Sequence, residues 1–194
     1  MRDLHSIRDS VRKIAHEAFG LDFFELIASE RRQLVVFKVT PTGVIDLTEH
    51  ITPEQAVLLP VPYELALAGY KVDLSSRVPD LNADVLILRD DVLEYSEPKF
   101  SGMIAHELTH WAIDSGYQDR IALIESDHVQ GEKLYRMTDS NMDHITQHTK
   151  LWCSYLVAAG RNLVAVNLWP ALADFLEDAL PESDRFFWDR SQFA

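Results

Sequence analysis

The sequence is poor in cysteine, in basic charge and in long apolar runs, and each shortage excludes a class of protein. Cys153 is the only cysteine among 194 residues, so neither an intrachain disulfide nor a cysteine-rich zinc ribbon can form. No stretch approaches the roughly 18 consecutive apolar residues of a membrane-spanning helix. The charged start of the chain does not resemble a signal peptide. We therefore expect a soluble, cytoplasmic protein without a membrane partner.

Basic residues are outnumbered, with 18 Lys and Arg against 31 Asp and Glu, which gives a net charge of -13. Sequence-independent nucleic-acid binding depends on a basic surface, so nucleic acid is an unfavourable partner for this chain. Two small basic groups, Arg31 with Arg32 and Arg8 with Arg12 and Lys13, are better explained as solvated helix faces or loops.

Hydrophobic periodicity predicts a mixture of helices and strands. The clearest elements are an amphipathic helix over residues 3–19 that ends at Gly20, a hairpin made by 33–39 and 44–47, and a short buried strand at 85–88. Further elements are expected as helical turns from Thr52 and over 63–68, a strand at 70–74, a helix over 98–115 ending at Gly116, a short helix at 120–124 within a polar connector, a long helix over 140–159 ended by Gly160, and a last helix over 171–180.

One stretch of the 98–115 helix contains the pattern His-Glu-x-x-His, formed by His106, Glu107 and His110. Residues four apart lie on the same helix face, so both imidazoles can reach one metal ion. Glu107 lies next to the first ligand and can act as general base on water and then as general acid. Two neutral imidazoles and a nearby carboxylate are typical of zinc-dependent hydrolases.

The residues around this pattern are apolar, which indicates a buried helix with polar groups placed inside it. A buried His or Glu without a partner is costly, and a metal ion would remove that cost. The alternative is that His106 and His110 are core residues satisfied by hydrogen bonds, while Glu107 forms a salt bridge.

A catalytic zinc usually has three protein ligands, so a third ligand is expected after His110. We favour His148, because it lies in a strongly apolar stretch where its burial needs a reason. His144, four residues earlier, is a possible additional ligand or a residue that orients His148, and His128 ranks third. The full set of candidates is Glu125, Asp127, His128, Glu132, Asp139, Asp143, His144 and His148.

These residues resemble the SprT-like zinc metallopeptidases, in which a His-Glu-x-x-His helix is followed by His-Gly-x-x-aromatic at the opening of a second helix. The resemblance covers roughly residues 85–160. Thr149 stands where the family commonly has Gly, and the third His follows 38 residues after the second. Five residues of this chain carry the match: His106, Glu107, His110, His148 and Trp152.

The resemblance implies an α+β, zincin-like fold, with a small mixed or antiparallel sheet packed on the active-site helix and a second helix that bears a ligand. It implies one zinc ion per chain and a protein or peptide substrate. Three His with a Glu base also favour zinc over manganese or cobalt. We predict one such domain over residues 1–180, with its metal-site core at about 85–160, followed by a tail at 181–194.

A hydrolase of this kind also needs groups that stabilise the transition state and orient the ligands. Tyr135, Tyr155 and Arg161 are possible transition-state stabilisers, and the sequence does not choose among them. Asp114, four residues after His110, is a possible hydrogen-bond partner of a ligand.

Two other functions remain open at this point. The chain could be a non-catalytic, zinc-stabilised interaction protein with an acidic surface. Its C-terminal tail could bind a protein partner, or it could occupy the active-site cleft and restrain activity. The tail is notable for its aromatic residues, Phe186, Phe187, Trp188 and Phe193.

Overall fold

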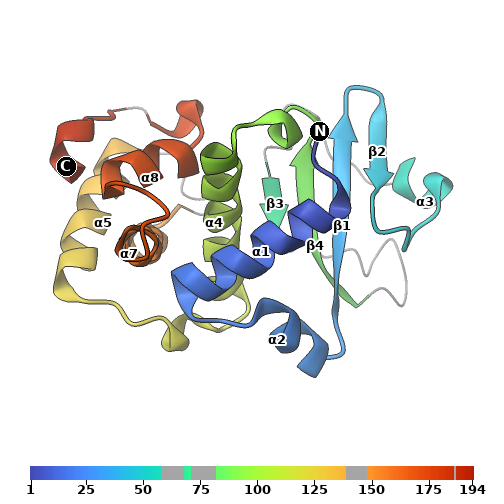
Figure 1. Ribbon diagram of the computed structural model, residues 1–194, viewed down its shortest axis with the longest axis horizontal. Coiled ribbons are helices and arrows are strands. Elements are labelled where there is room, and N and C mark those ends of the chain that lie inside the picture. The colour runs from blue at the N-terminus through green and yellow to red at the C-terminus, as the bar shows by residue number, and fades with distance from the viewer. Residues whose placement is uncertain (58–67, 71–81, 139–147, 186) are drawn as a thin grey trace. The chain divides into compact units, whose positions relative to one another are not determined.

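The computed structural model describes residues 1–57, 68–70, 82–138, 148–185 and 187–194 (Figure 1). The described chain has an α+β fold with one mixed sheet and a group of helices. No described helix combines the length and the apolarity that crossing a bilayer requires.

Residue contacts divide the chain into two compact units. The first, which we call the sheet unit, comprises Met1–Arg12 and Asp22–Ser96. The second, the helical unit, comprises Lys13–Leu21 and Glu97–Ala194. Helix α1 (Leu4–Phe19) contributes residues to both, and it ends at Gly20 as predicted, where a positive φ of 67° suits glycine.

The sheet unit is built on four strands in the order β2-β1-β4-β3 (Figure 1). The predicted hairpin is confirmed, because β1 (Gln33–Thr40) pairs antiparallel with β2 (Gly43–Asp46). The predicted buried strand is also confirmed as β4 (Ala83–Arg89), which runs parallel to β1. The edge strand β3 (Ala68–Tyr70) pairs antiparallel with β4, so the predicted helical turn over 63–68 is wrong at residue 68. The rest of that turn and residues 71–74 lie outside the described residues.

Alternating residues of the two central strands form the core of the sheet unit, as the two-residue period of a strand requires. Helix α2 (Phe23–Ser29) contacts β1, and α3 (Pro53–Val57) follows the cap predicted at Thr52, whose hydroxyl accepts from the backbone N–H of Gln55. The buried cluster consists of Val35, Phe37, Val39, Ile51, Ala56, Val85 and Ile87.

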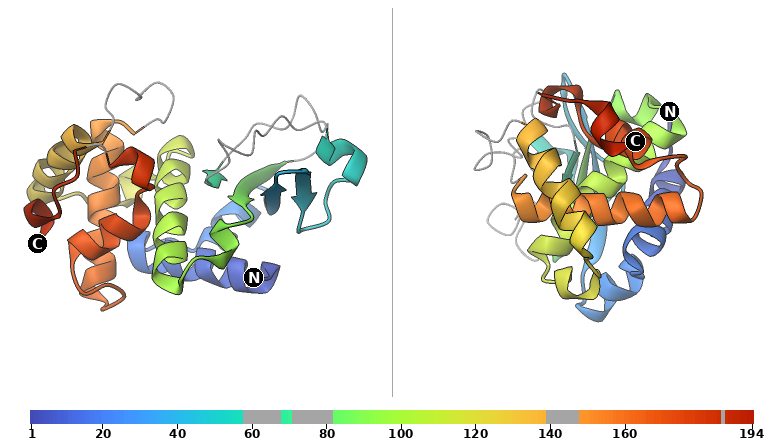
Figure 2. Two further views of the ribbon diagram at one scale, coloured as in Figure 1. Left: turned by 90° about the horizontal axis from the view of Figure 1, so that it is seen from above. Right: turned by 90° about the vertical axis from the view of Figure 1, so that its left-hand side faces the viewer.

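The helical unit contains α4 (Glu97–Asp114), α5 (Glu125–Met137), α7 (Lys150–Ala165) and α8 (Leu172–Ala179). Helix α4 packs on α7 and α8, and α7 also packs on α5 and α8. Figure 2 shows α5 crossing α7. The helix predicted over 98–115 is confirmed to within one residue at each end, and it ends before Gly116, which has a φ of 75°.

Two helices differ from prediction. The short helix expected at 120–124 is wrong, since the polar connector holds a 3-10 turn, η3 (Gln118–Arg120), and then the 13-residue helix α5. The helix expected over 140–159 is wrong at its C-terminal end, since α7 continues past Gly160 to Ala165. Residues 148 and 149 precede α7, and residues 140–147 lie outside the described residues. A Cβ at Gly160 would lie 2.4 Å from the Phe175 ring, so this glycine serves helix packing rather than helix termination.

The C-terminal tail packs within the helical unit. Two 3-10 turns form there, η5 (Glu182–Asp184) and η6 (Arg190–Phe193), and η6 contacts α8. Phe193 is buried and stacks with Trp188 at 5.3 Å, whereas Phe187 is 66% exposed.

Candidate metal centre

The structure brings together the three histidines favoured from the sequence. His106 and His110 lie one turn apart on α4, and His148 immediately precedes the cap residue of α7. The Nε2 atoms of His106 and His148 are 3.1 Å apart, and one ligand atom from each of the three lies within 4.8 Å of the others. The three side chains are therefore close enough to bind one metal ion. His144 lies outside the described residues.

Trp152 holds the three imidazoles from one side. Its ring stacks on His148 at 4.1 Å and on His110 at 4.9 Å, and it meets His106 edge-on at 4.8 Å. The backbone N–H of Trp152 donates to the hydroxyl of Thr149, which caps α7. Thr149 thus fixes His148 just before the start of α7. The predicted helix over 140–159 included His148, and this placement is wrong.

The outer nitrogens of two histidines face partners that the sequence did not reveal. Nδ1 of His106 is 2.9 Å from the carbonyl oxygen of Ala179, the last residue of α8. Nδ1 of His148 is 3.4 Å from a carboxylate oxygen of Asp184 in the tail. A backbone carbonyl has no sequence signature, and Asp184 is one acid among many in an acidic chain.

Close packing of α8 against α4 makes the first of these contacts possible. Gly102 lies four residues before His106, on the same face of α4. A Cβ at Gly102 would lie 2.7 Å from the backbone of Asp178 and 2.8 Å from the backbone nitrogen of Ala179. The absence of a side chain therefore lets the end of α8 reach the imidazole of His106.

These contacts leave the inner nitrogen of His106 free to bind a cation. A carbonyl oxygen only accepts hydrogen bonds, so Nδ1 of His106 carries the proton and Nε2 does not. Burial lowers the pKa of His106 well below 6.5, helped by His148 and His110, although the bond to Ala179 opposes the shift. Burial, with a smaller effect of His148, lowers the pKa of His110 to about 3. Both are neutral at pH 7, the state that binds metal.

Glu107 adds a buried carboxylate beside this cluster. It is 5% exposed, and its Oε1 lies 3.7 Å from Nε2 of His106. The carboxylate therefore lies on the ligand side of the ring, within reach of a molecule bound by the same nitrogen.

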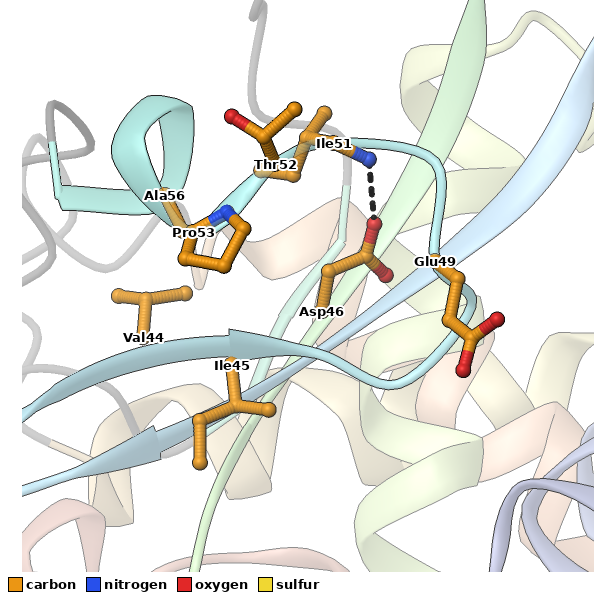
Figure 3. A pocket seen from close by; sticks show the side chains of 8 residues that line it. All are labelled: Val44, Ile45, Asp46, Glu49, Ile51, Thr52, Pro53 and Ala56. Atoms are coloured by element: carbon orange, nitrogen blue, oxygen red, sulfur yellow. Dashed lines mark hydrogen bonds between the residues drawn. The ribbon is translucent and has the colours of Figure 1, made fainter.

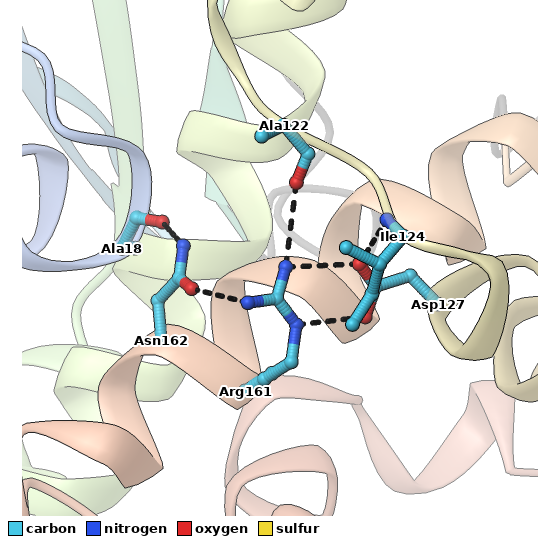
Figure 4. A network of polar contacts seen from close by, with 6 residues as sticks. All are labelled: Ala18, Ala122, Ile124, Asp127, Arg161 and Asn162. Carbon is cyan, nitrogen blue, oxygen red and sulfur yellow. Dashed lines mark hydrogen bonds and ion pairs between the residues drawn. The ribbon is translucent and has the colours of Figure 1, made fainter.

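The other ligand candidates among the described residues do not join the cluster. Asp127 is 1% exposed and accepts two hydrogen bonds of 2.9 Å from the guanidinium of Arg161 (Figure 4). His128 and Glu125 are exposed. Glu132 pairs with Arg136 and Lys150 on the surface. Asp139 and Asp143 lie outside the described residues.

The predicted transition-state stabilisers have other contacts. Arg161 also donates to the carbonyl of Ala122, and it lies roughly 18 Å along α7 from Thr149 (Figure 4). The Tyr155 hydroxyl donates to the carbonyl of Gln118 at 3.3 Å, and burial, with Asp119, raises its pKa. Tyr135 lies under the ammonium of Lys150 at 5.6 Å. Asp114, predicted as a hydrogen-bond partner of a ligand, is exposed.

The sheet unit has a pocket of about 330 Å³ beside β2 and α3 (Figure 3). The carboxylate of Asp46 lines this pocket, but it already accepts hydrogen bonds from the backbone N–H groups of Thr48, His50 and Ile51. None of the described lining residues is a histidine or cysteine, so this pocket does not offer the ligands of a second metal centre of the same kind.

The candidate centre thus combines three convergent imidazoles, a buried carboxylate and an aromatic wall. Its ligand atoms come from α4 and from the residue before the α7 cap, and its outer contacts come from α8 and the tail. Comparison of the chain with known protein families, with curated proteins and with solved structures returned no match, so the chemistry of the centre is inferred from its geometry.

Proposed function

We propose that this chain is a zinc-dependent metalloendopeptidase with a zincin-like centre, in which His106, His110 and His148 hold the metal and Glu107 is the general base and acid. The observation that carries the proposal is the approach of two inner nitrogens, Nε2 of His106 and Nε2 of His148, to 3.1 Å. The resemblance to SprT-like peptidases supports the choice of a peptide substrate.

The 3.1 Å approach is favourable when either a proton or a metal ion lies between the two nitrogens. The proton of His106 is held on Nδ1 by Ala179, and Asp184 favours a proton on Nδ1 of His148. Two bare Nε2 lone pairs would then repel each other unless a proton or a metal ion lay between them. The convergence of a third imidazole, His110, favours a metal.

The donor set fits zinc. Tetrahedral coordination with Zn–N of about 2.0–2.1 Å places ligand nitrogens about 3.3 Å apart, close to the 3.1 Å between His106 and His148. The ligand atom of His110 lies within 4.8 Å of those of the other two histidines. Three neutral imidazoles leave a fourth position open, as in catalytic rather than structural zinc sites. The bound metal would polarise the scissile carbonyl and acidify water.

Glu107 supplies the proton transfers of hydrolysis. Its carboxylate takes a proton from water as the oxygen of that water bonds to the scissile carbonyl carbon. It then returns this proton to the amide nitrogen as the carbon–nitrogen bond breaks, so the products are a carboxylic acid and an amine. A buried carboxylate next to the ligands is suited to both steps, and such acid–base catalysis contributes about 10²–10⁴-fold in rate.

Metal analysis and Glu107→Gln test the proposal together. The purified protein should contain one zinc per chain and cleave an unfolded protein such as fluorescently labelled casein. Glu107→Gln should retain zinc and lose about 10²–10⁴-fold of the cleavage rate. Glu97→Gln, an exposed substitution at the start of the same helix, serves as the matched control and should keep full activity.

Two results would contradict the peptidase. One is a Glu107→Gln variant that cleaves as fast as the wild type. The other is a fully zinc-loaded wild type that cleaves no unfolded substrate, which would favour the non-catalytic, zinc-stabilised alternative.

A further inference from the structure

The segment from Ala179 to Asp184 contacts the outer nitrogens of two histidines at once. Ala179 accepts from Nδ1 of His106, and Asp184 faces Nδ1 of His148. We infer that Asp184 is a positioning residue of the metal centre, which orients His148 by accepting its Nδ1–H, and that the segment Ala179–Asp184 is the outer shell of the centre rather than a detachable tail. This inference rests on the proposed metal centre but not on its peptidase activity.

The segment is fixed at both ends, so its carboxylate is held in place. Ala179 ends α8, and its carbonyl is one of the last four, which have no partner within a helix. Leu180 is 1% exposed and anchors the turn into η5. Arg185, the residue after Asp184, pairs with Glu177 on α8 at 3.7 Å. The side chain of Asp184 is 15% exposed, and that of His148 is 8% exposed.

The chemistry of the pair suits a metal ligand. A carboxylate only accepts hydrogen bonds when ionised, so it selects the Nδ1–H form of His148 and directs the Nε2 lone pair inward. The 3.4 Å separation is an ion-pair distance, about 0.2 Å longer than the usual upper limit of a hydrogen bond. The three imidazole ligands are neutral, so the negative charge of Asp184 would also attract a divalent cation bound by them.

This assignment differs from the expectation that the tail restrains activity by occupying the cleft. If the tail blocks the centre, substituting Asp184 should leave the metal affinity of the protein unchanged or raise it. A tail that orients a ligand lowers metal affinity when Asp184 is changed. The sign of the change in zinc affinity therefore separates the two roles.

The experiment compares Asp184→Ala and Asp184→Asn with Glu182→Gln, an exposed acid in the same 3-10 turn. Zinc affinity is measured by competition with a chromophoric chelator. Asp184→Ala should bind zinc about 10–100-fold more weakly than the wild type, and Glu182→Gln should bind as the wild type does. Asp184→Asn should fall between them, because its amide oxygen still accepts from Nδ1–H but carries no charge.

A second measurement reads the orientation of His148 without metal. Long-range ¹H–¹⁵N NMR of the metal-free protein identifies the ring nitrogen that carries the proton. Wild type and Asp184→Asn should show the Nδ1–H form of His148, and Asp184→Ala should lose this preference, a change that general destabilisation does not produce. Asp184→Asn has the same shape as the wild type and provides the comparison if Asp184→Ala does not fold.

The failure of this inference is distinct from the failure of the peptidase. Wild-type zinc affinity and an unchanged His148 proton position in Asp184→Ala would overturn the inference, whatever Glu107→Gln does. If only Asp184→Asn folds, wild-type zinc affinity in that variant would overturn it. A zinc-loaded wild type that cleaves nothing would overturn the peptidase and leave the role of Asp184 intact. If the wild type bound no zinc, the metal centre and the inference built on it would both be rejected.

Discussion

Gly102→Ala tests whether α8 must lie tightly against α4 for the centre to bind metal. The new Cβ would lie 2.7 Å from the backbone carbonyl carbon of Asp178. Non-bonded carbon atoms pack at about 3.5–4.0 Å, so the end of α8 must move outward by about 0.8 Å or more. The bond from His106 Nδ1 to the Ala179 carbonyl, now 2.9 Å, would then exceed the usual upper limit of about 3.2 Å.

The expected magnitude follows from this lost hydrogen bond. Loss of the outer partner of a metal-binding imidazole weakens metal binding about 10–100-fold, or about 1.4–2.7 kcal/mol. In the metal-free protein, overpacking lowers the free energy of unfolding by about 1–3 kcal/mol. The better helix propensity of Ala offsets about 1 kcal/mol of that loss. The free energy of metal binding should therefore change by more than the free energy of unfolding of the metal-free protein does.

Chelator competition measures zinc affinity, and urea unfolding in EDTA measures the stability of the metal-free protein. Gly160→Ala is an overpacking control, because the three atoms nearest to its Cβ belong to the side chains of Phe175 and Leu172 rather than to the backbone of α8. Phe175 is fully buried, so the control should also lower the free energy of unfolding, but it should weaken zinc binding less than Gly102→Ala does. If folded Gly102→Ala binds zinc with wild-type affinity, the Ala179 carbonyl does not orient His106 and the reasoning is refuted.

Three further predictions concern the same unit. Arg161→Gln should lower the free energy of unfolding by about 1–3 kcal/mol in urea titrations, because it leaves the buried Asp127 without its cation, while zinc affinity stays unchanged. In EDTA, stability should fall as the pH drops from 6.5 towards 3, by up to about 1.4 kcal/mol per pH unit for each of His106 and His110. The pKa values of both are lowered on folding, so the unfolded chain binds more protons in this range; His110→Gln should show a shallower slope. Cobalt(II) should quench the emission of Trp152, which is in contact with all three rings, and Trp152→Phe should lose that part of the quenching.

Local signals in the sequence predicted the elements that carry the first part of the centre. Helix α4 is defined by Pro98 near its start and Gly116 after its end, and both act through the backbone of the residues beside them. The spacing of His106 and His110 then places both rings on one face without any tertiary information. The prediction that His148 lies beside these two rings is also confirmed, because burial of a polar ring in an apolar stretch implied a partner.

The helices that were misjudged depend on packing that local patterns do not encode. The buried stripe of α5 consists of Asp127, Gly131, Leu134 and Met137. Two of these residues are not apolar, so hydrophobic periodicity did not detect the helix. Asp127 can be buried because Arg161 pairs with it. Gly131 is buried because α7 packs closely against it, so that a Cβ there would lie 2.7 Å from the backbone of Ser154. Both causes lie on another helix.

The outer contacts of the centre come from late in the chain, and this sets when the centre can form. Ala179 is 73 residues beyond His106. During synthesis, the helix bearing His106 leaves the ribosome well before residues 179–184 do. Until those residues emerge, the nascent chain has the His-Glu-x-x-His motif but lacks the acceptors that orient His106 and His148. For an enzyme that attacks unfolded polypeptide, this delay would protect its own unfinished chain from cleavage.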